Sequence, residues 1–182
     1  MNLIRPALLI LCLLPLAGCA GARHHPPLPT VAHVDLEKYA GRWYEIARYP
    51  HWFEKGCAAV TADYALRDDG TLEVVNRCVL ADKGGKIKQA VGRAKVVDPA
   101  TNARLKVSFF RPFYGDYWIL KLDPGYHYVV VGAPSRKYLW ILARTPQLEP
   151  DLLQQLISET GRLGFDPGRL IMTDQRINIR RD

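Results

Sequence analysis

The sequence predicts an all-β domain followed by one helix, and three observations lead to this prediction. From Gly41 onward, short runs of apolar or alternating residues recur with turn signals between them. Eight such runs precede residue 144, at a spacing typical of a closed up-and-down barrel or a sandwich of antiparallel strands. After Pro150 the apolar residues take a helical period instead. The length of 182 residues and the ordinary composition suit one globular domain with a sizeable core.

The eight runs are bounded by residues that favour turns. Residues 58–66 alternate between apolar and smaller or polar side chains, and the Asp68-Asp69-Gly70 sequence that follows is typical of a hairpin turn. The strands are short and the last two are apolar on both faces, which disfavours a porin-type barrel. The predicted strands are Arg42–Tyr49, Ala58–Leu66, Leu72–Val79, Ile87–Val97, Arg104–Phe110, Tyr117–Leu122, Tyr126–Val131 and Tyr138–Ala143.

One amphipathic helix is predicted between Pro150 and Gly164. Apolar side chains at positions 152, 153, 156 and 157 share one helical face, and polar side chains lie opposite. Proline suits the first helical turn and glycine the C-terminal cap, with Phe165 packing just beyond. Because an apolar stripe has to pack on an apolar surface, we expect the helix to cover the outer faces of strands Tyr126–Val131 and Tyr138–Ala143.

The first 18 residues have the features of a cleaved export signal. One basic residue precedes the apolar run Pro6–Leu16, which is shorter than the about 20 residues that a membrane-spanning helix needs. The signal ends in Leu16-Ala17-Gly18-Cys19, which resembles the lipobox of bacterial lipoproteins; a plain signal with a chance cysteine is the alternative. The resemblance implies acylation of Cys19 and, with Ala20 after it, location in the outer membrane. Several acyl chains anchor a protein stably.

Residues 19–33 are predicted to form a flexible tether, and residues 34–182 the folded domain. The tether is rich in proline and contains few apolar residues. Removal of residues 1–18 takes away one arginine, which lowers the formal net charge from +7 to +6. A flexible segment lacks the fixed geometry of a metal site, so no metal is expected at its three histidines, His24, His25 and His33.

Three motifs of the domain resemble those of the lipocalin family. Gly41-Arg42-Trp43-Tyr44-Glu45, at the start of the first predicted strand, matches the family's G-x-W signature. Tyr128 lies where the second motif falls, although the usual Thr-Asp before it reads Tyr126-His127 here. Arg144 matches the basic residue of the third motif. Two further runs are similar to the bacterial outer-membrane lipoproteins and apolipoprotein D-like members of the family, residues 106–115 and 138–146.

The resemblance, which covers about residues 34–174, implies an eight-stranded antiparallel up-and-down β-barrel with the C-terminal helix packed outside. Family topology implies a closed base, where Trp43 plugs the barrel under the stacked guanidinium of Arg144, next to Gly41. The role of these three residues is structural. The turns implied at the base are 68–70, 98–103 and 123–125, and the loops implied at the open mouth are 51–56, 110–114 and 133–138.

The barrel interior and its mouth are the expected ligand site. An eight-stranded barrel can hold one small ligand, and aromatic residues are abundant in the mouth loops. Arg111, Arg136 and Lys137 near the mouth are candidates to meet a carboxylate or phosphate head group. The expected ligand contacts, the first two foremost, are Tyr114, Trp140, Phe53, Tyr64, Phe109, Phe113 and Tyr117.

Two cysteines of the domain are expected to form a disulfide. Cys57 begins the second predicted strand and Cys78 ends the third, both toward the mouth, and export permits the bond. It would close a loop of 20 intervening residues and contribute about 3 kcal/mol. A two-residue turn at Asp68-Asp69 would instead pair Cys57 with Leu80, so a longer turn or a bulge has to absorb the difference. Two separate buried thiols are the alternative.

These features predict a binding protein anchored in the outer membrane on the periplasmic side, not an enzyme. The expected partner is a fatty acid or lysophospholipid, held for envelope lipid maintenance, and no cofactor is expected. Glu45, Asp63 and His127 are the candidate groups for a lipocalin-fold enzyme, but no nucleophile–base spacing, metal motif or phosphate loop accompanies them. A carrier of a non-lipid ligand such as a tetrapyrrole is the other alternative. Scattered basic residues and export exclude nucleic acid, and a homodimer is left open.

Overall fold

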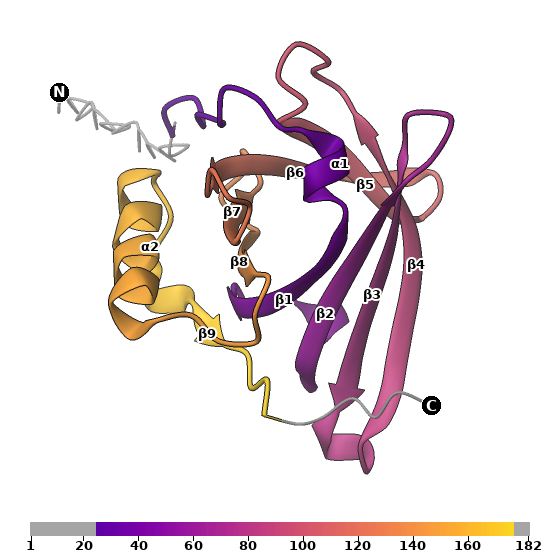
Figure 1. The fold of residues 1–182 in the computed structure, drawn as a ribbon. Helices are drawn as coiled ribbons and strands as arrows, with labels where there is room; N and C mark the ends of the chain where they lie inside the picture. Colours follow the sequence, from indigo (N-terminus) through magenta and orange to yellow (C-terminus); the bar gives the residue numbers. More distant parts are fainter. Residues whose placement is uncertain (1–24, 177–182) are drawn as a thin grey trace, which may run out of the picture.

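The computed structural model describes residues 25–176, which form a closed β-barrel (Figure 1). Strands β1 to β8 each pair antiparallel with the next along the chain, and β1 pairs with both β2 and β8. The prediction of an eight-stranded up-and-down barrel is therefore confirmed, and the sandwich alternative is wrong. The predicted signal peptide, Cys19 and His24 lie outside the described residues. The strands are β1 (Gly41–Arg48), β2 (Cys57–Leu66), β3 (Leu72–Leu80), β4 (Lys86–Val96), β5 (Arg104–Phe110), β6 (Phe113–Leu122), β7 (Tyr128–Gly132) and β8 (Leu139–Ala143).

Strand β6 starts earlier than the sequence predicts. It begins at Phe113 instead of Tyr117, because Gly115 pairs with Val107 and Phe113 pairs with Phe110. Residues 111–112 alone remain in the turn between β5 and β6. The mouth loop expected over residues 110–114 is therefore a tight hairpin.

Strand β7 starts two residues later than predicted, at Tyr128. Tyr126 has a positive φ of 61°, which is a turn conformation. The carboxylate of Asp123 accepts hydrogen bonds from the backbone N–H groups of Gly125 and His127 and so closes this turn at the base.

The predicted helix is present as α2 (Pro150–Arg162) and packs on the outside of the barrel (Figure 1). Leu156 is fully buried in the core that the helix shares with Val130 and other outward-facing residues of β7 and β8. Gly164 ends the helix with a φ of 82°, and Phe165 is buried beside it. Its ring meets Tyr49 edge-on, with 6.0 Å between centroids. Both the helix and its expected platform are confirmed.

Several short elements were not predicted. Helix α1 (Leu36–Tyr39) precedes β1, and its N-terminus is capped by the side chain of Asp35. Strand β9 (Ile171–Met172) pairs with the end of β1, where β2 has diverged. Beyond it, Gln175 Nε2 donates to the carbonyl oxygens of Glu45 on β1 and Val60 on β2, at 2.7 and 2.8 Å. The C-terminal segment therefore bridges β1 and β2 where their own pairing stops. Three 3₁₀ turns complete the elements, η1 (Trp52–Glu54), η2 (Ala81–Lys83) and η3 (Pro167–Arg169).

The chain packs against the domain before residue 34, the predicted domain start. Leu28 is buried in the core between helix and barrel, and the N–H of Val31 donates to the carbonyl oxygen of Ile119 at 3.0 Å. The carbonyl oxygen of Pro26 accepts a hydrogen bond from Arg136 at 2.7 Å. Residues 26–33 therefore lie on the barrel, because the few apolar side chains of this segment pack against it.

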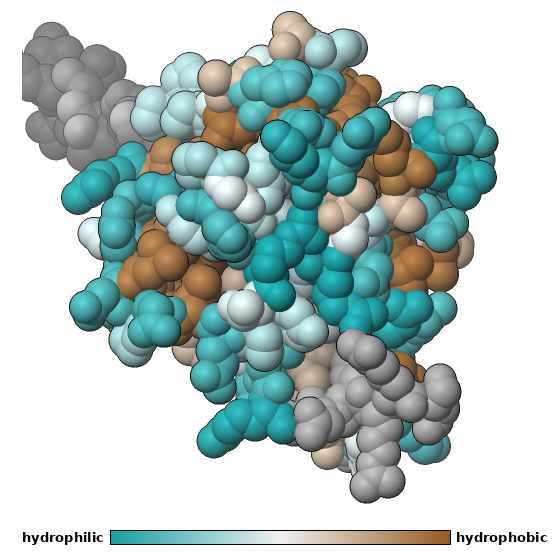
Figure 2. Space-filling view, viewed as in Figure 1, coloured by the Kyte–Doolittle hydropathy of each residue, from teal (hydrophilic) through white to brown (hydrophobic). Residues whose placement is uncertain are grey.

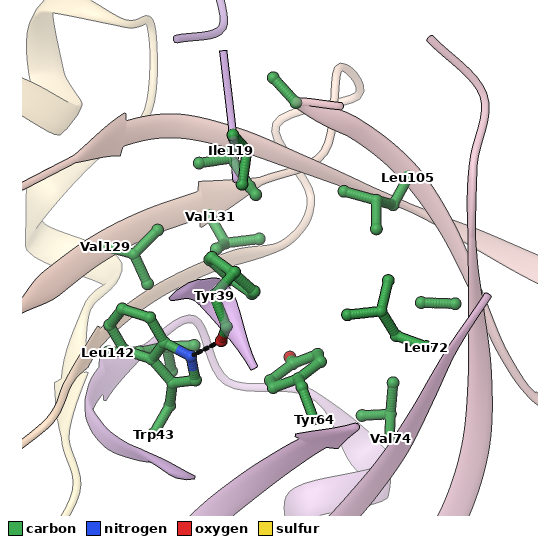
Figure 3. Packing of buried hydrophobic residues seen from close by; sticks show 13 residues of the cluster. Tyr39, Trp43, Tyr64, Leu72, Val74, Leu105, Ile119, Val129, Val131 and Leu142 are labelled. Carbon is green, nitrogen blue, oxygen red and sulfur yellow. Dashed lines mark hydrogen bonds between the residues drawn. The ribbon is translucent and has the colours of Figure 1, made fainter. Parts of the chain in front are cut away.

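Two apolar cores lie on either side of the barrel wall. The inner core includes Trp43, Tyr64, Leu72 and Ile119, whose side chains point into the barrel (Figure 3). The outer core lies under α2. The face shown in Figure 2 is mostly hydrophilic, with hydrophobic residues in small separate groups. Within residues 25–176, no helix has the length and apolar character that crossing a membrane requires.

Candidate ligand-binding site

One end of the barrel, the base, is closed by Trp43 and Arg144. The indole of Trp43 is fully buried, and its Nε1 donates to the carbonyl oxygen of Tyr39 in α1 at 2.9 Å. The guanidinium of Arg144 lies 3.9 Å from the centre of the indole ring and donates to the carbonyl oxygens of Lys38 and Arg42 at 2.7 and 2.8 Å. The Trp43 indole, the Arg144 guanidinium and helix α1 thus close this end of the interior.

Gly41 is required at the base by its backbone conformation. Its φ is 90°, in the region that favours glycine. A Cβ atom there would lie 3.4 Å from Arg144 Nη1. The glycine of the G-x-W motif therefore allows the turn from α1 into β1 directly beneath the guanidinium.

Three tyrosine hydroxyl groups meet inside the barrel above the base. Tyr64 donates to the hydroxyl of Tyr117 at 2.9 Å, and the hydroxyls of Tyr117 and Tyr39 are 2.7 Å apart. Burial raises the pKa of all three phenols above the ordinary value of 10, so they are neutral. Figure 3 shows Tyr39 and Tyr64 among apolar side chains. The hydroxyls satisfy one another among the apolar side chains of the inner core.

The wall of the interior is built from aliphatic side chains of strands on both sides of the barrel. β3 and β5 supply Leu72, Val74 and Leu105, and Val131 and Leu142 face them from β7 and β8 (Figure 3). This part of the lining, built from branched aliphatic side chains, provides no polar partner for a ligand. It favours a hydrocarbon group.

The other end of the barrel, the mouth, has a cluster of aromatic rings. The rings of His51 and Phe53, in the β1–β2 loop, stack with 3.8 Å between centroids. The ring centroid of Trp140 on β8 lies 5.4 Å from that of His51 and 6.0 Å from that of Tyr138. The expected contacts Phe53 and Trp140 are thus brought together, and His51 and Tyr138 join them without having been predicted.

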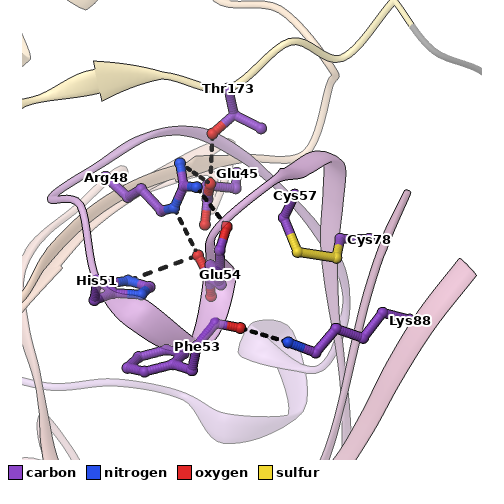
Figure 4. Close-up of a disulfide and its surroundings, with 9 residues drawn as sticks. All are labelled: Glu45, Arg48, His51, Phe53, Glu54, Cys57, Cys78, Lys88 and Thr173. Carbon is purple, nitrogen blue, oxygen red and sulfur yellow. Dashed lines mark hydrogen bonds and ion pairs between the residues drawn. A yellow bond between two sulfur atoms is a disulfide. The ribbon is translucent and has the colours of Figure 1, made fainter. Parts of the chain in front are cut away.

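A cluster of buried ionisable groups lies beside these rings (Figure 4). Arg48 Nε is 2.9 Å from Glu54 Oε2, and Arg48 Nη1 is 3.5 Å from Glu45 Oε1. Thr173, after β9, donates to Glu45, and the Nε2 atom of His51 lies 3.6 Å from Glu54. Sequence alternation alone would turn Ala47 inward and Arg48 outward. A bulge after Glu45 reverses this, so no local sequence pattern predicts the cluster.

The pKa values of this cluster follow from burial and from the pairing of two carboxyl groups with one guanidinium. Burial and the nearby Glu45 raise the pKa of Glu54 to about 9, although Arg48 acts in the opposite direction. Burial also raises the pKa of Glu45, against the effect of Arg48. Burial and Arg48 lower the pKa of His51 to about 4. At neutral pH the Glu54 carboxyl group therefore retains its proton, and the imidazole of His51 is neutral.

The predicted disulfide is present between Cys57 and Cys78, with Cα atoms 5.4 Å apart (Figure 4). Cys57 pairs with Leu80 in the β2–β3 ladder, so the bond runs diagonally between the strands. The register shifts between Ala58 and Thr61, which places the bulge opposite Cys78. The expected pairing of Cys57 with Leu80 is therefore present, and the disulfide forms because a bulge and a diagonal bond bring Cys78 within reach of Cys57. The alternative of two separate thiols is wrong.

The predicted phenylalanines and Tyr114 lie on opposite faces of the barrel wall. The ring of Phe109 covers Gly92 on the inner side, where an added Cβ would come within 2.7 Å of it. Phe113 shares the inner face of β6 with Gly115, at the rim. Tyr114 occupies the alternate position and lies under the ammonium of Lys95, 4.5 Å from its ring centre, on the outer face. Tyr114 therefore does not join the other predicted contacts.

The three expected head-group cations have different surroundings. Arg136 is buried and donates to the carbonyl oxygens of Pro26, Pro134 and Leu163, so it joins the N-terminal segment to the end of α2. Arg111 and Lys137 are exposed at the mouth. Lys88, which was not predicted, donates to the carbonyl oxygen of Phe53 at 2.6 Å (Figure 4).

The three candidate catalytic groups, Glu45, Asp63 and His127, each bind a different partner and do not contact one another. Asp63 accepts from Arg42 and Arg77 at 2.8 and 2.6 Å. His127 is exposed in the β6–β7 turn at the base and pairs with Asp123 at 2.7 Å. Glu45 belongs to the buried cluster near the mouth. Within residues 25–176, no group of His, Cys, Asp or Glu has the arrangement of a metal site.

Known proteins resemble this chain in both sequence and fold. A family model for the lipocalin-like domain matches residues 34–175. The outer membrane lipoprotein Blc of Vibrio cholerae is 42% identical over 174 residues, 95% of this chain and 100% of that protein. The outer membrane lipoprotein Blc of Escherichia coli is 44% identical over 152 residues, which are 82% of this chain and 85% of that protein.

A solved structure shows the same fold at low sequence identity. Insecticyanin from the tobacco hornworm Manduca sexta matches with a TM-score of 0.65 and 22% identity, covering 82% of this chain and 85% of that chain. The barrel, the external helix and the base closed by Trp43 and Arg144 agree with the family match over residues 34–175. The chain therefore belongs to the lipocalin family.

Proposed function

We propose that the protein binds a lipid with a single acyl chain, a fatty acid or a lysophospholipid, inside its barrel. One observation carries the proposal: the interior above the base is lined by aliphatic side chains, closed at the base by Trp43 and ringed by aromatic side chains at the mouth. This lining suits an acyl chain, because each buried CH₂ group contributes about 0.8 kcal/mol. Lys88, Arg111 and Lys137 supply positive charge at the mouth for a carboxylate or phosphate.

The proposed place of action is the periplasmic side of the outer membrane, with the protein anchored by acyl chains on Cys19. The leader sequence and its Leu-Ala-Gly-Cys ending support this proposal. Two relatives that are 42% and 44% identical are themselves named outer membrane lipoproteins. A lipid carrier in this position would serve maintenance of envelope lipids.

We propose a binding role rather than a catalytic one. Glu45, Asp63 and His127 do not form one constellation: Glu45 accepts a hydrogen bond from Thr173, Asp63 accepts from Arg42, and His127 pairs with Asp123. The buried carboxyl groups near the mouth are held by Arg48 and Thr173. These groups support the fold of the β1–β2 loop.

The binding proposal is tested by titrating the lipid-free protein with a fatty acid or with lysophosphatidylcholine while following tryptophan fluorescence. Trp140 lies at the mouth, whereas Trp118 lies on the outer face under Arg104, with the guanidinium 4.6 Å from the ring centre. We expect a saturable change that Trp140→Phe removes and Trp118→Phe preserves.

A matched pair of variants tests where the ligand lies. Phe109→Ala on the inner face is expected to weaken binding by about tenfold, because it removes roughly one buried aromatic contact. Tyr114→Ala on the outer face is expected to leave affinity unchanged. Equal effects of the two variants, or no saturable signal in the parent protein, would contradict the proposal. Mass spectrometry of the solvent extract of purified protein distinguishes a lipid from a tetrapyrrole.

A further inference from the structure

Three large aromatic side chains at the mouth point into solvent. Trp52 in the β1–β2 loop is 84% exposed, and Phe110 and Phe113 in the β5–β6 hairpin are 75% and 70% exposed. The two phenylalanine rings stack on each other, with 6.4 Å between centroids. Side chains of this size are seldom left in water without a function. Tryptophan and phenylalanine are also the residues that enter the interface of a lipid bilayer.

Charge is distributed unevenly between the two ends of the barrel. The mouth segments, residues 49–56, 80–88, 110–114 and 133–138, contain only two acidic residues, Asp82 and Glu54, and the Glu54 side chain is 12% exposed and paired with Arg48. Their basic residues are Lys55, Lys83, Lys86, Lys88, Arg111, Arg136 and Lys137. At the base the balance is reversed: seven acidic residues, Asp35, Glu37, Asp68, Asp69, Asp98, Asp123 and Glu149, accompany Lys38, Arg67 and Arg144. The aromatic end is therefore also the basic end, which suits an anionic surface.

The N-terminal segment leaves the barrel at the same end. Pro26 is bonded to Arg136 in the β7–β8 turn. In the order of the sheet this turn lies between the β5–β6 hairpin and the β1–β2 loop. Five residues separate Cys19 from His25, and a chain of that length reaches at most about 20 Å. A lipid on Cys19 would therefore hold the mouth, rather than the base, close to the bilayer.

We infer that the mouth of the barrel docks on the anionic bilayer that holds its own anchor, with Trp52 and Phe110 entering the lipid interface and the exposed basic mouth residues, which exclude Arg136, contacting phosphate groups. The inference rests on the proposed acylation of Cys19. Docking in this orientation opens the interior toward the lipid, so that an acyl chain passes between bilayer and barrel without crossing water.

Quenching by brominated lipid tests the docked orientation. The acylated full-length mature protein is reconstituted in phosphatidylcholine vesicles that contain phosphatidylglycerol and phosphatidylcholine with brominated acyl chains. We expect quenching of tryptophan emission, most of which is lost in Trp52→Phe and retained in Trp118→Phe. Lys55→Glu is expected to reduce the docked fraction, by about fivefold for each unit of charge, and high salt to act in the same direction.

A charge reversal at the base is the matched control. Lys38 is as exposed as a mouth lysine and pairs only with Asp35 at 3.8 Å, so Lys38→Glu is expected to leave quenching unchanged. Equal effects of the two charge reversals would overturn the inference. So would a protein that floats with the vesicles but whose Trp52 emission is unquenched. Titration with a fatty acid in the absence of vesicles is unaffected by docking, so lipid binding and docking fail independently.

Discussion

Arg144 acts on the closed end of the barrel through both its charge and its shape. The planar guanidinium covers the Trp43 ring at 3.9 Å while its N–H groups donate to backbone carbonyl oxygens of Lys38, Arg42 and Tyr126. These carbonyls belong to three separate segments that meet at the base. A single side chain thus joins α1, β1 and the β6–β7 turn.

Truncation of Arg144 is expected to destabilise the whole domain. Arg144→Ala removes the hydrogen bonds and the ring contact together, and we expect the free energy of unfolding to fall by about 2–4 kcal/mol. Arg144→Lys keeps the charge but loses the forked geometry, so it should recover only part of this loss. Denaturant unfolding measures both. Arg42→Ala removes a more exposed partner of Asp63 and is expected to cost less than about 1 kcal/mol; a similar cost for both alanines would contradict the assignment.

The buried cluster at the mouth predicts a loss of stability at alkaline pH. Burial raises the pKa of Glu54 to about 9, above the ordinary value of 4.5, so the folded protein holds this proton more tightly than the unfolded chain. The stabilisation is complete below about pH 4.5 and is lost as the pH rises through 9. We expect the free energy of unfolding to decline between pH 7 and 9, and less steeply in Glu54→Gln.

The measurement is denaturant unfolding at several pH values above 7. His51, whose pKa is lowered to about 4, affects stability only below about pH 6.5 and does not interfere in this range. Glu73→Gln is the matched control, because Glu73 is exposed and pairs with Arg67 at the surface. Identical pH profiles for the parent protein and Glu54→Gln would refute a protonated Glu54.

At the scale of elements, β-bulges decide which side chains meet in the interior. The bulge after Glu45 turns Arg48 inward, and the shift between Ala58 and Thr61 places Cys78 diagonal to Cys57. The sequence predicted the strands because apolar alternation and turn residues are local signals. It could not locate the bulges, since an extra residue leaves the local pattern almost unchanged. Phe53 and Trp140 of the aromatic cluster were therefore predicted, whereas Tyr114 was misplaced and the buried ionic cluster was missed.

Loss of the disulfide is expected to lower stability through the β2–β3 hairpin. The bond links residues 21 positions apart and restricts the unfolded chain, so Cys57→Ala with Cys78→Ala should reduce the free energy of unfolding by about 3 kcal/mol. Reductant should shift the unfolding midpoint of the parent protein by a similar amount and leave the double variant unchanged. If reductant also shifted the unfolding midpoint of the double variant, the shift in the parent protein would not come from this disulfide.

At the scale of the whole molecule, a barrel sealed at one end couples ligand binding to stability. A lipid held in the interior binds the folded state alone, so lysophosphatidylcholine at a hundredfold excess over its Kd should stabilise the domain by about 2.7 kcal/mol. Thermal unfolding with increasing ligand measures this effect. Phe109→Ala should need a higher concentration for the same shift, and a shift that does not depend on ligand concentration would argue against a site inside the barrel.

By itself, the sequence determined the strands and the external helix through periodicity and turn chemistry, while the resemblance of its motifs to the lipocalin family implied the closed barrel and the base of Trp43 and Arg144. The disulfide was expected from the two cysteines of the domain, and the structure decided between it and two separate thiols. Tertiary structure decided which face each mouth residue takes. Tyr114 lies on the outer face, and Arg136 is used to hold the N-terminal segment. The bridge by Gln175 likewise depends on a gap between β1 and β2 that closure of the barrel creates. Such contacts join residues far apart in the chain, and no local pattern specifies them.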